Sequence, residues 1–295
     1  MDIFKIKDSN KIFKLSVAKY EQETNRKEPY FQITTPPPNY YALCPECENP
    51  IEIVNLYIEQ HKKRKEDNLP LYARHVNRNI KNIANYSQLD FDNCSLKNPS
   101  TITGGGKRTG NSPSTIEIIN LLKNHTELIY RFMSEIIGLK ISEKLFNKII
   151  EKFKQSNGEL YKGVTKFNLP YTILYMSDNN NISYESLNLK SEFSKTIRTA
   201  IIEKSELFEI SKYDKIVPKT SFEKGKYKAL EIYFSDHKLK YNNSIESMLV
   251  IIKENNNNKL NEILRTTIEF SKKDLFINSV NKEKRLKEII KSYYP

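Results

Sequence analysis

The first forty residues alternate between apolar and polar positions in short stretches. Residues 3–6 form one stretch, residues 12–17 a second and residues 30–33 a third, with polar turns between them. Their apolar members are mostly β-branched or aromatic, so the pattern predicts two or three β-strands joined by loops. Three successive prolines follow within residues 35–39. Because proline donates no backbone hydrogen bond, we expect this segment to be a stiff connector and not a strand.

Helical spacing begins after Pro113. The sequence Ser114–Glu117 is a capping box, and the apolar residues after it recur every three or four positions as far as Gly138. This pattern predicts one helix that ends at the glycine. A second amphipathic helix is predicted from Ser142 to about Asn157. Apolar stripes of this kind are typical of faces that pack against a core.

From residue 160 onward the two kinds of pattern are mixed. We expect strands at 171–176, 229–235, 245–253 and 260–270, and helices at 191–208 and 285–293. The asparagine run at residues 255–258 predicts a hairpin turn, since asparagine tolerates left-handed backbone geometry. The predicted fold class is therefore α+β. It has an N-terminal β region, a helical middle and a β-rich C-terminal domain.

All three cysteines of the chain lie between residues 44 and 94. Cys44 and Cys47 are separated by two residues, His75 follows after 27 more, and Cys94 follows after a further 18. Three cysteines and one histidine make a complete set of ligands for one tetrahedral ion. The spacing predicts a structural Zn2+ site, because four protein ligands leave no open position for a substrate or a water molecule.

Two alternatives stay open for these side chains. In the first, Cys44, Cys47 and Cys94 are ordinary buried thiols. In the second, His61 replaces His75 as the fourth ligand. His61 begins a strongly charged run at residues 61–67, which favours exposure to solvent.

The segment around these four residues resembles a known module. Its Cys-Pro-x-Cys start at Cys44, the aromatic-alanine pair at residues 72–73 before His75, and the trailing Cys94 are similar to the N-terminal zinc module of the competence protein CoiA family and related uncharacterised prokaryotic proteins. The chain departs from that family in an inserted Arg74 and in longer spacers. The resemblance implies a zinc module of about fifty residues. The nuclease activity attributed to the family does not follow, because its nuclease half has no counterpart here.

The chain is strongly basic. It holds 48 Lys and Arg residues against 36 Asp and Glu residues, a net charge of +12, and residues 95–295 account for 34 of the basic and 23 of the acidic ones. Such an excess favours a polyanion, so nucleic acid, either DNA or RNA, is the partner we expect. No apolar run is long enough to span a bilayer, and the N-terminus lacks the apolar core of a secretion signal. We therefore expect a cytosolic protein without a membrane partner.

Four of the eight glycines lie in residues 104–110. This stretch fails the Walker phosphate-loop pattern, because a lysine follows three glycines directly. It is expected to be part of a flexible linker, and its cations Lys107 and Arg108 suit contacts with a phosphate backbone. The predicted domains are a β region with the zinc module at 1–98, the linker at 99–113 and a basic α+β domain at 114–295.

The two helices on either side of Gly138 also allow a helix-turn-helix arrangement. In that hypothesis the second helix contacts nucleic acid, and Lys144, Lys148 and Lys152 bind its phosphates. The competing interpretation is a pair of packing helices, since short amphipathic pairs are common in proteins of every class.

Hydrolytic chemistry is the remaining candidate activity. Asp236 and Lys238 follow a predicted strand, and with Asp214 upstream they are similar to the acid and D-x-K arrangement of metal-dependent nucleases. The competing interpretation is a charged turn. No histidine outside the zinc set lies in a recognisable catalytic motif.

These observations favour a zinc-stabilised, non-enzymatic protein that binds nucleic acid or serves as an accessory factor. The setting we expect is a prokaryotic DNA-uptake, mobile-element or antiviral defence system. One alternative is a metal-dependent nuclease that uses Asp214, Asp236 and Lys238. The other is a zinc-braced adaptor between proteins. Salt-sensitive binding of DNA or RNA favours the first function, and magnesium-dependent cleavage favours the nuclease.

Overall fold

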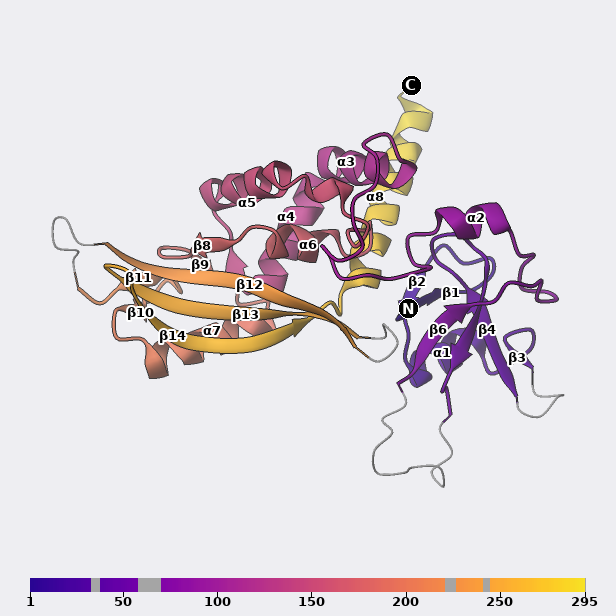
Figure 1. Cartoon of the computed structure of the whole chain (residues 1–295), viewed down its shortest axis with the longest axis horizontal. Coiled ribbons are helices and arrows are strands. Elements are labelled where there is room, and N and C mark those ends of the chain that lie inside the picture. Colours follow the sequence, from indigo (N-terminus) through magenta and orange to yellow (C-terminus); the bar gives the residue numbers. More distant parts are fainter. Residues whose placement is uncertain (33–37, 58–69, 221–226, 241–244, 295) are drawn as a thin grey trace. The chain divides into compact units, whose positions relative to one another are not determined.

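The structure, a computed structural model, describes residues 1–32, 38–57, 70–220, 227–240 and 245–294 (Figure 1). The chain divides into two compact units. The first contains residues 1–105, 238–246 and 270–295, and the second contains residues 106–237 and 247–269. Most of the predicted proline connector and the whole of the charged run with His61 lie outside the described residues.

The first unit is built on a six-stranded antiparallel sheet. Its strand order is β2-β1-β4-β5-β6, and β3 pairs with β4. The strands are β1 (Ile3–Lys5), β2 (Ile12–Lys14), β3 (Phe31–Gln32), β4 (Asn39–Leu43), β5 (Pro50–Val54) and β6 (Tyr72–His75). The short strands that alternation predicts in residues 3–33 are confirmed.

A helix, α1 (Val17–Thr24), also lies in this region, so the expectation of strands and loops alone was wrong there. Ser16 caps the helix, and its hydroxyl accepts a hydrogen bond from the Lys19 amide at 3.2 Å. Tyr20 is fully buried, and its hydroxyl donates to the Tyr41 carbonyl at 2.8 Å. The polar residues that suggest a turn in the sequence belong in part to the exposed side of this helix.

The last helix, α8 (Lys273–Tyr293), completes the first unit. The prediction of a short helix from residue 285 was wrong about its start. Its first half buries Phe276, Ile277 and Val280. The Asn278 side chain accepts from the Ile12 amide at 2.9 Å and donates to the Ile12 carbonyl at 2.6 Å. These two bonds satisfy backbone groups of β2, which would otherwise be an open sheet edge.

The second unit combines a group of helices with a long sheet. The helices are α3 (Pro113–Asn124), α4 (Thr126–Ile137), α5 (Glu143–Gln155), α6 (Leu169–Tyr175) and α7 (Glu192–Lys204). The sheet has the order β14-β13-β12-β8, formed by β8 (Asn179–Asn181), β12 (Lys228–Lys240), β13 (Ile245–Asn256) and β14 (Lys259–Glu269). Two small ribbons pair β7 (Leu139–Lys140) with β9 (Ser186–Leu187) and β10 (Phe208–Ile210) with β11 (Ile216–Pro218). Figure 1 shows α4, α5 and α6 above the long strands.

The α+β class and several predicted elements are confirmed. The helix expected within 191–208 is α7, and the strands expected at 229–235, 245–253 and 260–270 are β12, β13 and β14. The asparagine run makes the hairpin turn between β13 and β14. Asn257 and Asn258 have φ values of 51° and 71°, which is the left-handed geometry that asparagine tolerates.

The strand predicted at residues 171–176 is wrong, because this segment lies in the helix α6. Every residue from Leu169 to Leu174 is buried, so the apolar run has no polar face to mark its period. A short run that is apolar all round fits a buried strand and a buried helix equally well. Pro170 is compatible with either, and here it lies in the first turn of the helix.

The single helix predicted up to Gly138 is two helices, α3 and α4, separated at His125. Ser112, and not Ser114, is the N-cap of α3, and its hydroxyl accepts a hydrogen bond from the Thr115 amide at 3.3 Å. Pro113 then takes the first helical position, where a backbone N–H would have no helical hydrogen-bond partner, so its absence loses no hydrogen bond. The predicted end of α4 at Gly138 is confirmed, with φ at 69°.

Replacement of Gly138 by alanine is expected to destabilise the second unit by about 3 kcal/mol. Left-handed geometry costs an alanine about 1–2 kcal/mol, and overpacking adds about 1–3 kcal/mol. The added Cβ would lie 2.5 Å from the backbone nitrogen of Ser194. Gly106 is the matched control, because its φ is 72° and a Cβ there meets nothing within 4 Å. Urea unfolding should show a larger loss for Gly138→Ala than for Gly106→Ala, and equal losses would contradict this packing.

Candidate metal centre

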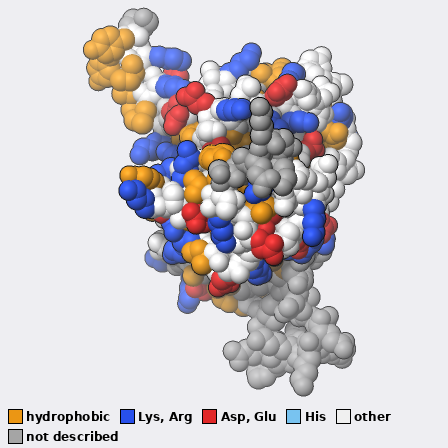
Figure 2. Space-filling view, turned by 90° about the vertical axis from the view of Figure 1, so that its left-hand side faces the viewer, with side chains coloured by type: hydrophobic (Ala, Val, Ile, Leu, Met, Phe, Trp, Pro, Cys, Tyr) orange, Lys and Arg blue, Asp and Glu red, His pale blue; other side chains and the backbone are white. Residues whose placement is uncertain are grey.

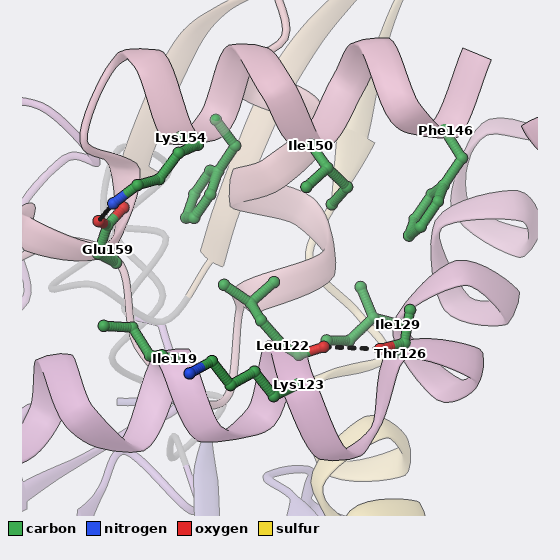
Figure 3. Close-up of a pocket in the computed structure, with 10 residues that line it drawn as sticks. Ile119, Leu122, Lys123, Thr126, Ile129, Phe146, Ile150, Lys154 and Glu159 are labelled. Atoms are coloured by element: carbon green, nitrogen blue, oxygen red, sulfur yellow. Dashed lines mark hydrogen bonds and ion pairs between the residues drawn. The ribbon is translucent and has the colours of Figure 1, made fainter. Parts of the chain in front are cut away.

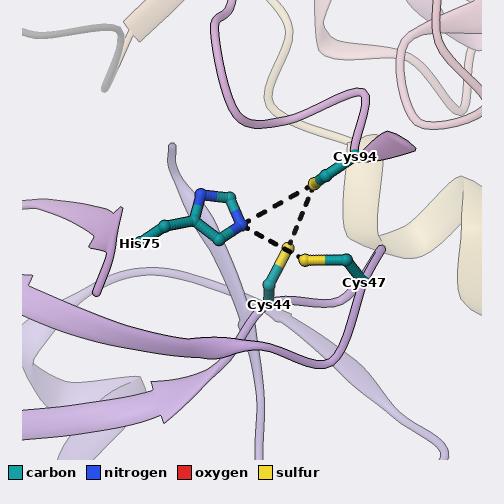
Figure 4. Close-up of side chains that lie close together, drawn as sticks. All are labelled: Cys44, Cys47, His75 and Cys94. Carbon is teal, nitrogen blue, oxygen red and sulfur yellow. Dashed lines mark hydrogen bonds between the residues drawn. The ribbon is translucent and has the colours of Figure 1, made fainter. Parts of the chain in front are cut away.

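Four side chains converge at the β4–β5 turn of the first unit's sheet. The sulfur atoms of Cys44, Cys47 and Cys94 and a ring nitrogen of His75 all lie within 4.8 Å of one another (Figure 4). The Cys44 and Cys94 sulfurs are 3.7 Å apart, and His75 Nε2 is 3.4 Å from the Cys47 sulfur and 3.7 Å from the Cys94 sulfur. The cysteines are free thiols. The four residues that the spacing selects are thus brought together into a Cys3His cluster.

Three elements of the chain position these ligands. Cys44 and Cys47 lie in the turn between β4 and β5, where Glu48 takes a left-handed φ of 55°. His75 ends β6, and its register opposite Ile51 places it beside the start of β5 and therefore beside this turn. Cys94 follows the short helix α2 (Gln88–Asn93). Antiparallel pairing of β5 with β6 explains how His75 comes to lie beside Cys47, which is 28 positions earlier in the chain.

Three of the distances within the cluster fit a tetrahedral ion. With metal–sulfur bonds of about 2.3 Å and metal–nitrogen bonds of about 2.0–2.1 Å, tetrahedral geometry places two sulfurs about 3.8 Å apart and a sulfur and a nitrogen about 3.6 Å apart. The separations of 3.7, 3.4 and 3.7 Å agree with these values. Thiolate and imidazole are also the ligand types that Zn2+ prefers in structural sites. The cluster is therefore suited to hold a metal ion.

The surrounding backbone and side chains hold the ligands in place. The side-chain nitrogen of Asn49, Nδ2, lies 3.4 Å from the Cys47 sulfur and donates to the Ser87 carbonyl at 3.0 Å. The Ser87 backbone amide in turn donates to Asn49 Oδ1 at 2.6 Å. The Leu96 amide donates to the Cys94 sulfur at 3.4 Å. Such outer contacts orient ligands and stabilise thiolate charge. Asn49 is 1% exposed, and its role was not predicted from the sequence.

Protonation in the cluster is uneven. Burial raises the pKa of the Cys44 thiol well above its usual range, because a buried thiolate loses its hydration. Hydrogen bonds from Cys44 and Cys94 lower the pKa of the Cys47 thiol. A metal cation must therefore displace a proton from Cys44, and acid should weaken metal binding.

The cations predicted to bind phosphate from the glycine-rich stretch are engaged within the second unit. The Arg108 guanidinium donates to the carbonyls of Tyr161 and Val164, and the Arg108 amide donates to the Leu160 carbonyl at 2.7 Å. The Lys107 ammonium lies 3.3 Å from the Ser156 carbonyl and 4.6 Å from the centre of the Tyr161 ring. In this geometry Arg108 stabilises the chain around residues 160–164.

The three lysines of α5 that were predicted to bind phosphate differ in their contacts and exposure. Lys148 donates to the Asn179 carbonyl at 3.1 Å, and Lys152 lies 3.5 Å from the Asp178 carboxylate. Both are half-buried, whereas Lys144 is exposed. Two of the three lysines therefore lie against residues 178–179, at the start of β8.

The three residues of the nuclease alternative lie in two different parts of the second half of the chain. The Asp214 carboxylate forms an ion pair with Arg198 in the turn between β10 and β11. Asp236 and Lys238 are exposed residues of β12, and Asp236 has a φ of 49° that departs from regular strand geometry. Within the described ranges, the Cys3His cluster is the one group of three or more His, Cys, Asp or Glu side chains close enough to share a metal ion.

Among the described helices, none is both long and apolar enough to cross a lipid bilayer. Comparison of the chain with protein-family models, with curated proteins and with solved structures found no match.

Proposed function

We propose that this chain is a nucleic-acid-binding protein whose first unit is stabilised by a structural Zn2+ ion. The zinc assignment rests on the Cys3His ligand set and its tetrahedral distances. Four protein ligands close the coordination sphere, so the ion braces the fold and activates no water. The contact with nucleic acid is assigned to the second half of α8.

An exposed basic helix face supports this proposal. Every residue from Lys284 to Tyr294 is exposed. Lys284, Lys287 and Lys291 are spaced three and four positions apart, so they share one face of the helix. Their ion pairs, Lys287 with Glu283 and Lys291 with Glu288, are exposed and therefore weak. A helix face of this kind can approach the phosphates of DNA or RNA without prior rearrangement.

On the one face of the molecule that Figure 2 shows, basic side chains are dispersed. On the face shown in Figure 2, Lys and Arg side chains alternate with Asp, Glu and apolar side chains and do not form a continuous basic patch. The end of α8, at the upper left of that view, carries hydrophobic side chains with basic ones beside them. This distribution favours one local contact over a broad electrostatic groove.

A salt titration tests the nucleic-acid proposal. The wild-type protein is expected to bind a DNA or RNA duplex at about 50 mM salt, with an affinity that falls steeply as salt rises, because binding releases counterions. The triple variant Lys284→Gln, Lys287→Gln, Lys291→Gln should bind at least about tenfold more weakly. Its slope of log affinity against log salt should be shallower by about 3, roughly 0.9 for each lost phosphate contact.

The lysines of α5 provide the matched control. The variant Lys144→Gln, Lys148→Gln, Lys152→Gln removes the same charge from α5, the helix that the sequence analysis predicted to bind phosphates. It should leave the salt slope nearly unchanged. A larger effect from this control than from the α8 variant would move the contact to α5. Failure of the wild-type protein to bind DNA or RNA at about 50 mM salt would refute the function itself.

A protein adaptor is the second candidate, and a different face of α8 favours it. Leu286, Ile290 and Tyr293 are 52%, 60% and 76% exposed, and their spacing places them together on the side of the helix away from the three lysines. An exposed apolar stripe is typical of a surface that a partner covers. The variant Leu286→Ser, Ile290→Ser separates the two functions. It should spare nucleic-acid binding and abolish a salt-insensitive protein complex.

A further inference from the structure

The second unit contains an apolar cavity of about 430 Å3 between α3, α4 and α5 (Figure 3). Its apolar lining consists of Ile119, Leu122, Ile129, Phe146, Ile150 and Phe153. Figure 3 shows the side chains of α5 pointing down toward those of α3 and α4, with the space between them. The volume lies within the range of small-molecule sites, about 300–1,000 Å3.

This space is large for a packing defect. Interiors are close-packed, and a void lined by apolar groups costs stability in proportion to its volume. Phe153 and Ile129 are 2% and 1% exposed, whereas the other four apolar side chains are only half-buried. Part of the lining is therefore left open to solvent. An occupant that buries it would gain hydrophobic free energy.

The cavity also has a charged end. Glu159 is buried, and its carboxylate is neutralised by the Lys154 ammonium at 2.8 Å. Lys123, at the C-terminal end of α3, is exposed, and its ammonium forms no hydrogen bond or ion pair with any described residue. In Figure 3 its ammonium points toward the end of the cavity where Lys154 and Glu159 lie. Two cations and one anion give this end a net charge of +1, which favours an anionic group.

We propose that the cavity binds a medium- or long-chain carboxylate, with its alkyl chain between the helices and its carboxylate at Lys123. An apolar cavity of about 150 Å3 holds a six-carbon ring, so this volume accommodates an alkyl chain on the order of a dozen carbons or more. The lining supplies no unpaired acidic group that would repel the carboxylate. This site is independent of the metal centre and of α8.

Titration calorimetry with dodecanoate, below its critical micelle concentration, tests the site. The wild-type protein should bind one molecule per chain. Lys123→Glu should weaken binding of dodecanoate about tenfold or more and leave binding of the uncharged dodecan-1-ol unchanged. Lys144→Glu, a charge reversal at an exposed residue of α5 that does not line the cavity, is the control and should behave like wild type.

A tryptophan reporter locates the alkyl chain. The chain contains no tryptophan, so Phe146→Trp introduces a single emitter into the lining, and Ile116→Trp places one at an exposed position of α3 outside it. A dodecanoate that carries bromine at its terminal carbon should quench the first variant and not the second. The proposal is overturned if wild type shows no saturable binding, if both reporters are quenched equally, or if Lys123→Glu and Lys144→Glu weaken binding alike. Should Phe146→Trp fail to fold, the calorimetry decides alone.

Discussion

Cys44→Ser is expected to abolish metal binding and to unfold the first unit, the largest effect of any single substitution in the chain. Purified wild-type protein should contain close to one zinc ion per molecule by elemental analysis, and the variant close to none. In isolated zinc-binding peptides the metal contributes about 10–16 kcal/mol, whereas a whole domain is stable by only about 5–15 kcal/mol. The first unit should therefore be unable to fold without its ion.

The position of the cluster explains why the effect should be large. Cys44 and Cys94 are 0% and 4% exposed and belong to the hydrophobic core of the first unit, together with Phe4, Tyr20 and Ile51. The ion would join the turn after β4, the end of β6 and the residue after α2. Its loss leaves the Asn49–Ser87 hydrogen bonds and the strand pairing to hold these elements together, and leaves polar thiols in the core.

Hydrogen exchange provides the measurement, and metal removal provides the control. In Cys44→Ser, amides of β4, β5 and β6 should lose protection while those of α4 and α6 in the second unit keep it. Treating wild type with a chelator should produce the same pattern, and treating the variant should add nothing. A variant that retains zinc, or that loses it with unchanged protection, would contradict a structural role.

The spacing in the sequence was sufficient to select the four residues that the structure brings together as a Cys3His cluster. Cys44 and Cys47 are separated by two residues and lie in one turn, and the pairing of β5 with β6 brings His75 beside that turn. Asn49 could not be selected, since a single buried asparagine has no distinguishing pattern. Its role depends on Ser87, 38 residues away, whose backbone bonds both ends of the Asn49 side chain.

Other features depend on tertiary context that periodicity does not contain. The run at 171–176 is apolar on all sides, so burial and not pattern decides that α6 is a helix. The lysines of α5 have helical spacing, but the pattern does not reveal that the start of β8, at residues 178–179, lies against two of them. The helix predicted at 285–293 contains Lys287 and Lys291, but the pattern does not reveal that this end of α8 is exposed while its first half packs on β2 through Asn278.

Lys273→Met is expected to destabilise the first unit by about 3–5 kcal/mol. Lys273 is buried, and its ammonium lies 2.7 Å from the Asp2 carboxylate and 3.0 Å from the Glu246 carboxylate. Burial alone would lower the pKa of Lys273, but the two carboxylates outweigh it and raise the pKa above its usual range. Removing the cation leaves two buried anions without compensation, which is the costly way to break a buried ion pair.

The control is Lys291→Met on the same helix, whose ion pair with Glu288 is exposed and should contribute about 0–1 kcal/mol. Thermal unfolding should separate the two variants by about 10 °C. Equal losses for the two variants would mean that the two buried carboxylates are not the source of the penalty.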